Sequence, residues 1–422
     1  MSASIVDTDS DDEFPAGWEE RVTLEGKVFY VNHETKTTQW THPTTGKKKI
    51  VKGELPYGWE RKILEDGTVC YIDHINQKTT YTDPRLAFAE EVKDSPYDFR
   101  QRFDGNSRAL QVLQGRDLTG KYIIVTGANS GIGFETARAF AMHGARVILA
   151  CRNMKSAEES RRKILKERPE AKLEIMEIDL ASLKSVHQFS ENYKQKKWYD
   201  KYSETVKTEH CLVLRPLHLL ILNAAVFGLP YTKTEDDLEM TFQVNHLSHF
   251  YLTKLLLDLL VKSSPSKVIV VSSESHRFTD LSCDNICEEK LSPSPKNYQD
   301  MRAYNLSKLC NVLFSSHLDK IMHNKGVASL SLHPGNMMYT SLARNWWLYR
   351  MLFFLVRPFT KSMEQGAATT VYCATASELD GVGGIYFNNC CRCPPSSAAE
   401  DSELAQKLWD ISEKMILDRV NR

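Results

Sequence analysis

The sequence has no excess of charge of either sign, because lysine plus arginine and aspartate plus glutamate both total 54. A global basic field is therefore missing, and we expect no direct binding to nucleic acid. A short basic run lies between the two halves of the N-terminal region, at Lys47 to Lys49 with Lys52. This run could act as a weak nuclear localisation patch, but a solvated linker is the preferred interpretation.

An export signal and a long apolar run are also missing. The segment from Asp7 to Glu13 is rich in acidic residues, where a secretory signal would need positive charge followed by an apolar stretch. The most apolar stretch, Trp346 to Phe359, contains Arg350 and Arg357 and is shorter than the ~20 residues of a spanning helix. We therefore expect no transmembrane segment and a cytoplasmic location, with the nucleus and the mitochondrion as further candidate compartments.

Cysteine is present at 10 positions, but the pattern is not that of a disulfide-rich secreted protein. In a long chain without an export signal, such residues indicate a reducing compartment. The cluster of Cys390, Cys391 and Cys393 lacks a second ligand pair at zinc-finger spacing. We predict no metal site.

An internal repeat is the first positive feature, since residues 15–43 recur at residues 56–84 with an offset of 41. The matched pairs include Trp18 with Trp59, His33 with His74 and Pro43 with Pro84. A unit this short is too small for a catalytic domain. It indicates a tandem recognition module ahead of a larger body.

Each copy is predicted to form three short strands. In the first copy these begin at Trp18, run from Lys27 to Asn32, and run from Thr37 to Thr41, with Gly26 at a turn. A sheet this small needs a compact cluster of large side chains, and Trp18, Tyr30 and Pro43 can supply it on one face.

The opposite face of the first copy is predicted to be an exposed aromatic surface. Side chains alternate along a strand, so Phe29, Val31 and His33 point away from Tyr30, where Trp40 can join them. A purely structural small sheet is the alternative interpretation.

The first copy closely resembles the WW domain family, whose modules bind proline-rich peptides. The resemblance is carried by Pro15, Gly17, Trp18, Phe29, Tyr30, Asn32, His33, Thr38, Trp40 and Pro43. It implies that Phe29 and Trp40 clasp a polyproline II segment, with an adjacent pocket for the tyrosine of a Pro-Pro-x-Tyr ligand. The peptide-binding residues that it implies are Phe29, Val31, His33, Lys36, Thr38 and Trp40.

The second copy keeps the structural face but not the clasp. Cys70 stands in place of Phe29, and Tyr81 stands in place of Trp40. Aromatic side chains dominate such interfaces, so the loss of two of them removes much of the stacking surface. We predict that the second copy supports the first or binds weakly.

From Lys121 onward, apolar runs alternate with helical patterns. The predicted strands are Tyr122 to Val125, Arg146 to Ala150, Leu173 to Ile178, Leu217 to Leu222, Lys267 to Val271, Val327 to Leu332 and Gly384 to Phe387. This alternation predicts an α/β fold with a doubly wound parallel sheet, whose ligand binds at the carboxyl ends of the strands.

A glycine-rich turn follows the first of these strands and precedes the helical pattern Phe134 to His143. Glycines in this setting allow a tight turn and a close approach of the backbone to a pyrophosphate at the helix N-terminus. The residues of the turn predicted to bind a dinucleotide are Thr126, Gly127, Asn129, Ser130, Gly131, Ile132 and Gly133.

The second strand is followed by Arg152, with no acidic residue to grip a ribose hydroxyl. A carboxylate there would repel a 2′-phosphate, whereas Arg152 would pair with it. We therefore favour NADP(H) over NAD(H) as the cofactor.

The predicted catalytic group consists of Ser273 at a strand end and of Tyr304 and Lys308 on a helix. A spacing of four places the tyrosine and the lysine on one helix face. A phenol with a reference pKa of ~10 needs a nearby cation to exchange a proton near neutrality. Ser273 would bind the substrate carbonyl, and Tyr304 would donate a proton to it as hydride arrives.

The order of these motifs resembles the short-chain dehydrogenase/reductase family over residues 121 to about 390. The resemblance implies that Asp179 contacts the adenine, that Asn223 orders the central strands and that Asn245 holds a water that links Lys308 to solvent. It also places the loop from Pro334 and Gly335 to Thr340 at the nicotinamide carboxamide. Asp179 as a helix cap and Asn245 as a buried hydrogen-bonding residue are the alternatives.

Within that family, the surroundings of Ser273 and Tyr304 are similar to those of retinol and steroid dehydrogenases. Trp346 to Phe359 follows the nicotinamide loop, where the family places its substrate-covering segment, so we expect a bulky apolar ketone or alcohol. Simple core packing is the alternative. Residues 194–216 form an unusually long polar connection and are interpreted as a surface insertion or a gene-model error.

The sequence predicts several segments in a fixed order. It comprises an acidic tail (1–14), two modules (15–45 and 56–86) joined by a basic linker (46–55), a connector (87–116), the dehydrogenase domain (117–395) and a C-terminal helix (396–422). The combination resembles an intracellular scaffold of growth and apoptosis control. Two hypotheses stay open: a targeted oxidoreductase, and an adaptor whose dehydrogenase body binds cofactor or partners with little turnover.

Overall fold

The computed structural model describes residues 14–92 apart from Leu24, residues Ser95 and Tyr97, and residues 101–195, 215–335 and 361–420. The predictions on the acidic tail, on most of the 194–216 connection, on Thr340 and on Trp346 to Phe359 lie outside these residues. The chain divides into two compact units, one of residues 1–100 with 114–118 and one of residues 101–113 with 119–422.

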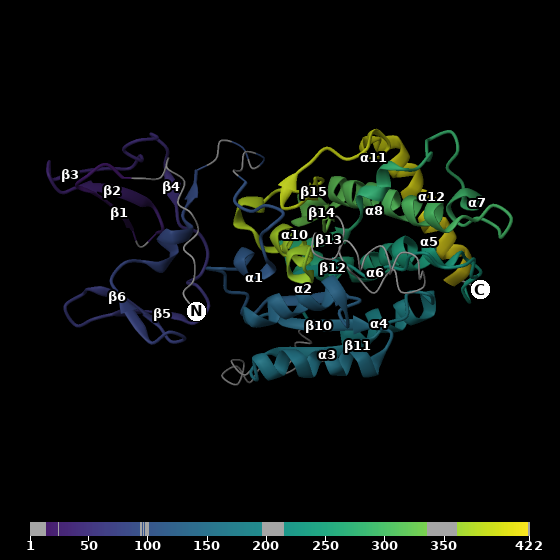
Figure 1. The fold of residues 1–422 in the computed structure, drawn as a ribbon, viewed down its shortest axis with the longest axis horizontal. Helices are drawn as coiled ribbons and strands as arrows, with labels where there is room; N and C mark the ends of the chain where they lie inside the picture. The colour runs from purple at the N-terminus through teal and green to yellow at the C-terminus, as the bar shows by residue number, and fades with distance from the viewer. Residues whose placement is uncertain are drawn as a thin grey trace. The chain divides into compact units, whose positions relative to one another are not determined.

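The first unit contains the two repeats, each as a three-stranded antiparallel sheet (Figure 1). The first sheet consists of β1 (Trp18–Val22), β2 (Val28–Asn32) and β3 (Thr37–Gln39), and the second of β5 (Trp59–Ile63), β6 (Val69–Asp73) and β7 (Lys78–Thr80). The repeat extends to the backbone, since Lys36 and Gln77 both adopt positive φ, at 58° and 53°. The prediction of two small β modules is confirmed.

The segment between the sheets contains a short strand, although Lys47, Lys48 and Lys52 are exposed, as expected of the solvated linker predicted for Gly46 to Lys52. Strand β4 (Lys49–Ile50) pairs with β8 (Glu90–Glu91), which follows the short 3-10 helix η2 (Pro84–Phe88). The lysine run forms ion pairs with acidic residues of this unit: Lys47 with Glu91 at 2.7 Å, Lys52 with Glu90 at 3.6 Å and Lys49 with Glu20 at 3.9 Å.

The buried cluster of the first sheet is larger than the sequence indicated. Val28 and Tyr30 are joined by Val51 from the inter-sheet segment, and Leu86 and Ala89 from beyond the second sheet pack against them. Trp18 packs there as predicted, whereas Pro43 is not part of the cluster. The core of the first module therefore depends on residues that follow the second.

The second unit is an eight-stranded sheet in the order β11-β10-β9-β12-β13-β14-β15-β16. Its strands are β9 (Tyr122–Thr126), β10 (Arg146–Cys151), β11 (Lys172–Glu177), β12 (Leu219–Leu222), β13 (Ser266–Val271), β14 (Val327–His333), β15 (Tyr386–Asn388) and β16 (Cys391–Arg392). All neighbours are parallel except the edge pair β15 and β16. The predicted doubly wound parallel sheet is confirmed.

Helices cover the two faces of this sheet (Figure 1). One group consists of α2 (Gly131–Met142), α3 (Met154–Glu167) and α10 (Met363–Thr375), which contact one another along the chain α3, α2, α10. The other consists of α4 (Leu183–Gln195), α6 (Ser248–Lys262), α8 (Asp300–Met322) and α12 (Ser402–Val420). The shorter helical elements are α1 (Ala109–Val112), α5 (Met240–Phe242), η4 (Gln243–Leu247), η5 (Glu274–Arg277), α7 (Glu288–Leu291), η6 (His323–Lys325), η9 (Ser377–Leu379) and α11 (Ser397–Glu400).

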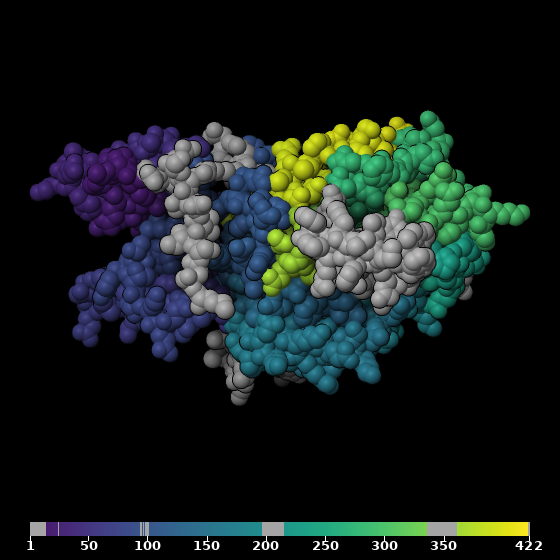
Figure 2. Space-filling view, viewed as in Figure 1, coloured from purple at the N-terminus to yellow at the C-terminus, as the bar shows by residue number. Residues whose placement is uncertain are grey.

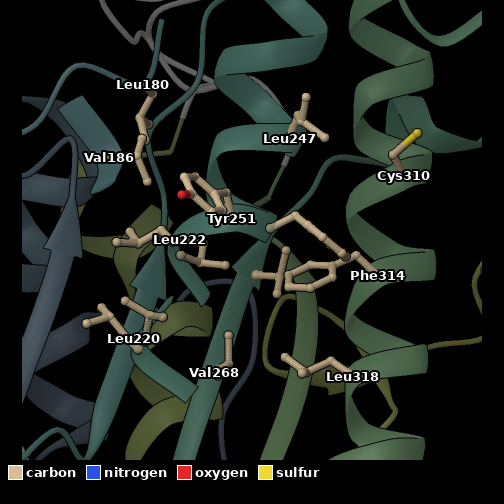
Figure 3. Close-up of a cluster of buried hydrophobic side chains, with 14 of the residues drawn as sticks. Leu180, Val186, Leu220, Leu222, Leu247, Tyr251, Val268, Cys310, Phe314 and Leu318 are labelled. Atoms are coloured by element: carbon tan, nitrogen blue, oxygen red, sulfur yellow. The ribbon is translucent and has the colours of Figure 1, made fainter. Parts of the chain in front are cut away.

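The main hydrophobic core lies between the sheet and the second group of helices. Figure 3 shows Leu220 and Leu222 of β12 facing Tyr251 of α6, with Phe314 and Leu318 of α8 nearby. Burial of each such side chain contributes about 2 kcal/mol. This packing holds the carboxyl ends of β12 and β13 in fixed positions beside α8.

Two segments that the sequence placed outside the dehydrogenase domain pack within the second unit. Residues 101–113 belong to the second unit, where α1 packs against α2 and α10 and buries Val112 and Leu113, so the connector over 87–116 is not a simple linker. The predicted C-terminal helix is present as α12, and it packs on α8 within the same core.

The neighbouring residues Cys390 and Cys391 lie at a hairpin between β15 and β16, where Asn389 and Cys390 adopt positive φ.

Candidate active site

The glycine-rich turn joins β9 to α2 and leaves room for a ligand. A Cβ on Gly133 would lie 2.4 Å from Asn223 Nδ2 and from the Gly127 carbonyl oxygen, whereas a Cβ on Gly131 would meet nothing within 4 Å. Ser130 at the start of α2 makes no side-chain cap, so the first backbone N–H groups are not capped by it. Free N–H groups at a helix start, beside a glycine that faces open space, fit a pyrophosphate.

Asn223 connects the two central strands at their carboxyl ends. Its Nδ2 donates to the Thr126 carbonyl oxygen at 2.9 Å, and its backbone N–H donates to Thr126 Oγ1 at 2.9 Å. These bonds tie β9 to the residues after β12 directly beside the glycine turn. The geometry agrees with the predicted ordering role, which stays a prediction.

The adenosine side of the turn carries one basic and one acidic residue. Arg152 follows β10 with an exposed side chain, and its Nη1 lies 4.0 Å from Asp179 Oδ1. Asp179 also accepts a bond from the Ala181 N–H at 2.9 Å, which is how a capping residue behaves. The loose, exposed pair leaves the Arg152 guanidinium accessible to a phosphate.

Asn129 and Ser160 stabilise this side of the turn. The Ser160 hydroxyl donates to the Asn129 carbonyl oxygen at 3.0 Å, and Asn129 Nδ2 donates to Ser156 Oγ at 3.1 Å. Both serines lie on α3, so the turn is fixed to the helix that follows Arg152. Thr126, Ser130 and Ile132 complete the predicted turn beside it.

Ser273 follows β13 and begins the turn η5. Its Oγ accepts a bond from the Ser275 N–H at 3.3 Å, and its carbonyl oxygen accepts one from the His276 backbone N–H at 3.0 Å. The Ser273 hydroxyl also interacts with the Tyr304 hydroxyl, which lowers the pKa of that phenol in part. The structure therefore brings Ser273 and Tyr304 together, as predicted.

Tyr304 and Lys308 lie one turn apart on α8, and the Lys308 Nζ atom is 5.5 Å from the centre of the Tyr304 ring. Burial raises the pKa of Tyr304 to about 12 and lowers the pKa of Lys308 to about 8. Lys308 donates to the Val271 carbonyl oxygen at 3.1 Å. A buried cation beside a partly buried phenol stabilises the phenolate whenever it forms.

Asn245 lies within the π-helical turn η4, which interrupts the helix between α5 and α6. Its side chain bonds the Val226 backbone in both directions, at 2.8 and 3.0 Å, and Nδ2 also donates to Ser307 Oγ at 3.0 Å. These contacts match the alternative of a buried hydrogen-bonding residue. The role of Asn245 in holding a water stays a prediction.

The loop after β14 reaches the same edge of the sheet. Gly335 adopts a φ of 110°, and a Cβ there would lie 3.0 Å from the Lys361 side chain. Pro334 and Gly335 thus follow β14 as predicted for the nicotinamide loop, whereas Thr340 lies outside the described residues. Their contact with a cofactor stays a prediction.

Two residues near the catalytic group were missed in the sequence analysis. Phe227 packs its ring edge against Tyr304, with ring centres 4.8 Å apart. His276 is fully buried beneath Ser273. Phe227 lies four residues after Asn223, close enough to have been found, but a histidine three residues after Ser273 carries no spacing signal of its own.

A second candidate site lies on the first module. The rings of Phe29 and Trp40 meet edge to face with centres 5.9 Å apart, and Trp40 is 53% exposed. Val31 pairs with Thr38 across β2 and β3 on the same face, and His33 Nε2 lies 2.7 Å from Glu19 Oε2. Lys36 forms the exposed turn between these strands.

The corresponding face of the second module is different. Cys70 is only 4% exposed, and Tyr81 is 69% exposed. His74 repeats the contact of His33, with Nε2 at 2.8 Å from Glu60 Oε2. The framework is retained, but the aromatic pair is not.

Two features of the described residues bear on other kinds of site. No helix among them is long and apolar enough to cross a membrane. The same part of the chain holds no group of three histidine, cysteine or acidic side chains arranged around a metal position.

Comparisons with known proteins agree with both parts of the structure. Residues 14–43 match the WW domain family, and residues 121–279 match the short chain dehydrogenase family. The chain is 57% identical over 422 residues to a WW domain-containing oxidoreductase of Gallus gallus, covering 100% of this chain and 98% of that one. It is 36% identical to retinol dehydrogenase 12 of Mus musculus, covering 71% of this chain and 87% of that one.

A solved structure supports the fold of the second unit. The crystal structure of an uncharacterized protein from Mycobacterium Paratuberculosis is similar with a TM-score of 0.54 at 27% identity, covering 71% of this chain and 95% of that one.

Proposed function

Since the chain belongs to the family of WW domain-containing oxidoreductases, we propose that it is an NADP(H)-dependent reductase or dehydrogenase of apolar carbonyl compounds and alcohols. The observation that carries this proposal is the convergence of Ser273, Tyr304 and Lys308 at the carboxyl edge of the sheet, beside the glycine turn. Reduction and oxidation are the two directions of one reaction, and both use the same groups.

The chain supplies proton transfer and orientation. The Ser273 hydroxyl would donate to the substrate carbonyl oxygen and hold it next to the Tyr304 hydroxyl. Tyr304 would then give its proton to that oxygen as negative charge develops there. Lys308 would stabilise the phenolate left behind, because its cation lies beside the ring in a region of low dielectric.

The cofactor class follows from the fit of the glycine turn, and a bound dinucleotide would supply the hydride. Its pyrophosphate would lie at the start of α2 against Gly131, where the structure leaves open space and the backbone has a positive φ that favours glycine. The preference for NADP(H) is supported by the exposed guanidinium of Arg152. An arginine forms charge-assisted bonds with a phosphate that a ribose hydroxyl cannot match.

An apolar substrate is supported by two observations. Phe227 lies against the ring of Tyr304 and adds an aromatic surface to the site. The similarity to a retinol dehydrogenase adds a relative whose name implies a long apolar alcohol. We propose steroid-like or retinoid-like carbonyls and alcohols as the first compounds to test.

The first module would supply targeting. Its exposed Phe29 and Trp40 pair offers two aromatic surfaces to a polyproline II segment, and we propose Pro-Pro-x-Tyr proteins as the partners. We also propose a cytoplasmic location, with nuclear and mitochondrial pools. The buried Cys70 of the second module supports binding through the first module.

The alternative is an adaptor in growth and apoptosis signalling whose second unit has little turnover. A steady-state assay of NADPH oxidation across a panel of carbonyl compounds tests the enzymatic proposal, and turnover that disappears in Tyr304→Phe supports it. In cells, an adaptor keeps its effect in Tyr304→Phe and loses it in Trp40→Ala. A tethered enzyme loses its effect in both variants.

A further inference from the structure

His276 occupies a fully buried position between the candidate catalytic serine and the segment that follows β16. Its Nδ1 atom lies 2.7 Å from the Ser273 carbonyl oxygen. Its Nε2 atom lies 3.1 Å from the backbone nitrogen of Ser396, 120 residues further along the chain. The imidazole therefore bridges two backbone groups from distant parts of the second unit.

The chemistry of the two partners determines the protonation of the ring. A carbonyl oxygen can only accept a hydrogen bond, so Nδ1 must carry a proton. A backbone N–H can only donate, so Nε2 must be unprotonated. Burial lowers the pKa of His276, which favours this neutral form.

The turn around His276 is attached to the same distant region by further bonds. The Tyr386 hydroxyl donates to Glu274 at 2.8 Å, and the Arg277 guanidinium donates to the Pro394 carbonyl oxygen at 2.8 Å. Arg277 also pairs with Glu274 at 2.7 Å. Because contacts from Glu274, His276 and Arg277 attach η5 to β15 and to residues 394–396, the turn has little freedom to move alone.

Ser273 is the residue that this arrangement holds. Its carbonyl oxygen receives both the backbone N–H and the ring N–H of His276, at 3.0 and 2.7 Å. Its hydroxyl is thereby presented toward Tyr304 from a turn whose opposite end is anchored at Ser396. A small displacement of a reacting group costs roughly 100-fold in rate.

We propose that His276 is a positioning residue, which couples the Ser273 hydroxyl to the C-terminal segment at Ser396 through its neutral imidazole. This inference rests on the proposed function, because it assigns Ser273 the role of orienting the substrate carbonyl. It adds that residues 394–396, more than a hundred positions from Ser273 in sequence, form part of the support of the site.

A backbone substitution tests the bridge from the Ser396 end. Ser396 has a φ of −71°, which proline can adopt, so Ser396→Pro removes the N–H donor and the hydroxyl, and its ring Cδ takes the place of the N–H hydrogen and displaces the imidazole. Ser396→Ala removes the hydroxyl and keeps the donor, which makes it the matched control. His276→Ala removes both bonds at once.

The first readout is amide hydrogen exchange of the peptide that spans residues 273–278. We expect roughly 10-fold faster exchange in His276→Ala and in Ser396→Pro, and wild-type exchange in Ser396→Ala. Unchanged protection in Ser396→Pro, with the variant folded, would overturn the proposal. This measurement needs no turnover, so it stands even if the wild-type chain reduces no carbonyl and the proposed function fails.

The second readout is a double-mutant cycle on the rate of carbonyl reduction. We expect kcat to fall roughly 10- to 100-fold in His276→Ala and in Ser396→Pro, with NADPH affinity within about threefold of wild type. If His276 acts through Ser273, the Ser273→Ala, His276→Ala double variant is no slower than Ser273→Ala. Additive losses would show a general structural effect and would reject the positioning role.

Discussion

The ammonium group of Lys308 lies over the ring of Tyr304, 5.5 Å from its centre, one helical turn further along α8. The cation acts on the phenol through space, because Lys308 donates a hydrogen bond to the Val271 carbonyl oxygen. The effect of Lys308 on catalysis therefore depends on whether it is charged.

This dependence predicts the pH profile of carbonyl reduction. Burial raises the pKa of Tyr304 to about 12, so the phenol keeps the proton that it must donate across the working range. Burial lowers the pKa of Lys308 to about 8, so its charge is lost as the pH rises through that value. We expect kcat/KM to be level below about pH 7 and to fall up to about tenfold per pH unit above pH 8.

The pH profile of Lys308→Arg is the control, since arginine stays charged throughout this range. Whatever activity this variant retains should lack the fall above pH 8. A wild-type profile that stays level to pH 10 would contradict the assignment.

Removal of the Tyr304 hydroxyl should abolish the proton transfer and spare the fold. For Tyr304→Phe we expect kcat to fall roughly 10²- to 10⁴-fold, because the general acid is lost. NADPH affinity, measured by fluorescence titration, should stay within about threefold. Retention of most of the activity would mean that another group delivers the proton.

Arg152 should determine the choice of dinucleotide. In Arg152→Asp, loss of a charge-assisted bond and repulsion of the 2′-phosphate should raise the KM for NADPH roughly 10- to 100-fold. The KM for NADH should stay level or fall. Arg162→Asp on the exposed side of α3 is the control, and steady-state kinetics with both cofactors give the answer; an unchanged KM for NADPH in Arg152→Asp counts against the preference.

Two alanine substitutions in the glycine turn should separate packing from ligand binding. A Cβ on Gly133 would lie 2.4 Å from Asn223 Nδ2, so Gly133→Ala should lower the thermal stability of the apoprotein. A Cβ on Gly131 would point into open space at a φ of 58°, so Gly131→Ala should cost only about 1 kcal/mol of stability. Its main effect should be weaker NADPH binding, and calorimetry with and without NADPH would show whether the two effects separate in this way.

The two modules should differ in peptide affinity. Trp40→Ala removes one side of the aromatic clasp, so we expect binding of a Pro-Pro-x-Tyr peptide to weaken at least about tenfold. Tyr81→Ala should change the affinity less than about twofold. Isothermal titration of the complete chain distinguishes the two, and the reverse order would assign recognition to the second module.

Much of the fold could be predicted because its signals are local. The parallel strands are apolar runs that are buried on both faces, and the glycine turn needs backbone conformations that only glycine adopts easily. The pairing of β4 with β8 could not be predicted in this way. Strands of two residues carry no periodic pattern, and the paired residues, Lys49 with Glu91 and Ile50 with Glu90, lie far apart in the sequence.

In the candidate site, too, contacts between residues close in sequence could be predicted, and contacts between distant residues could not. Tyr304 and Lys308 are four residues apart, so helix geometry alone places them together. The bridge from Ser273 through His276 to Ser396 joins residues whose proximity is produced by the complete sheet. The environment of Asn245 was equally hidden, since a single π turn leaves no mark on hydrophobic periodicity.

The return of residues 84–91 to the first sheet has a practical consequence for any dissection of this chain. Val51, Leu86 and Ala89 cover Tyr30, so a fragment that stops at the end of the first repeat exposes the apolar side of its own sheet. We therefore expect a fragment that also contains the second repeat and residues 84–89 to be more stable than a fragment of the first repeat alone. A substitution that unfolds the second repeat should therefore also weaken peptide binding by the first module.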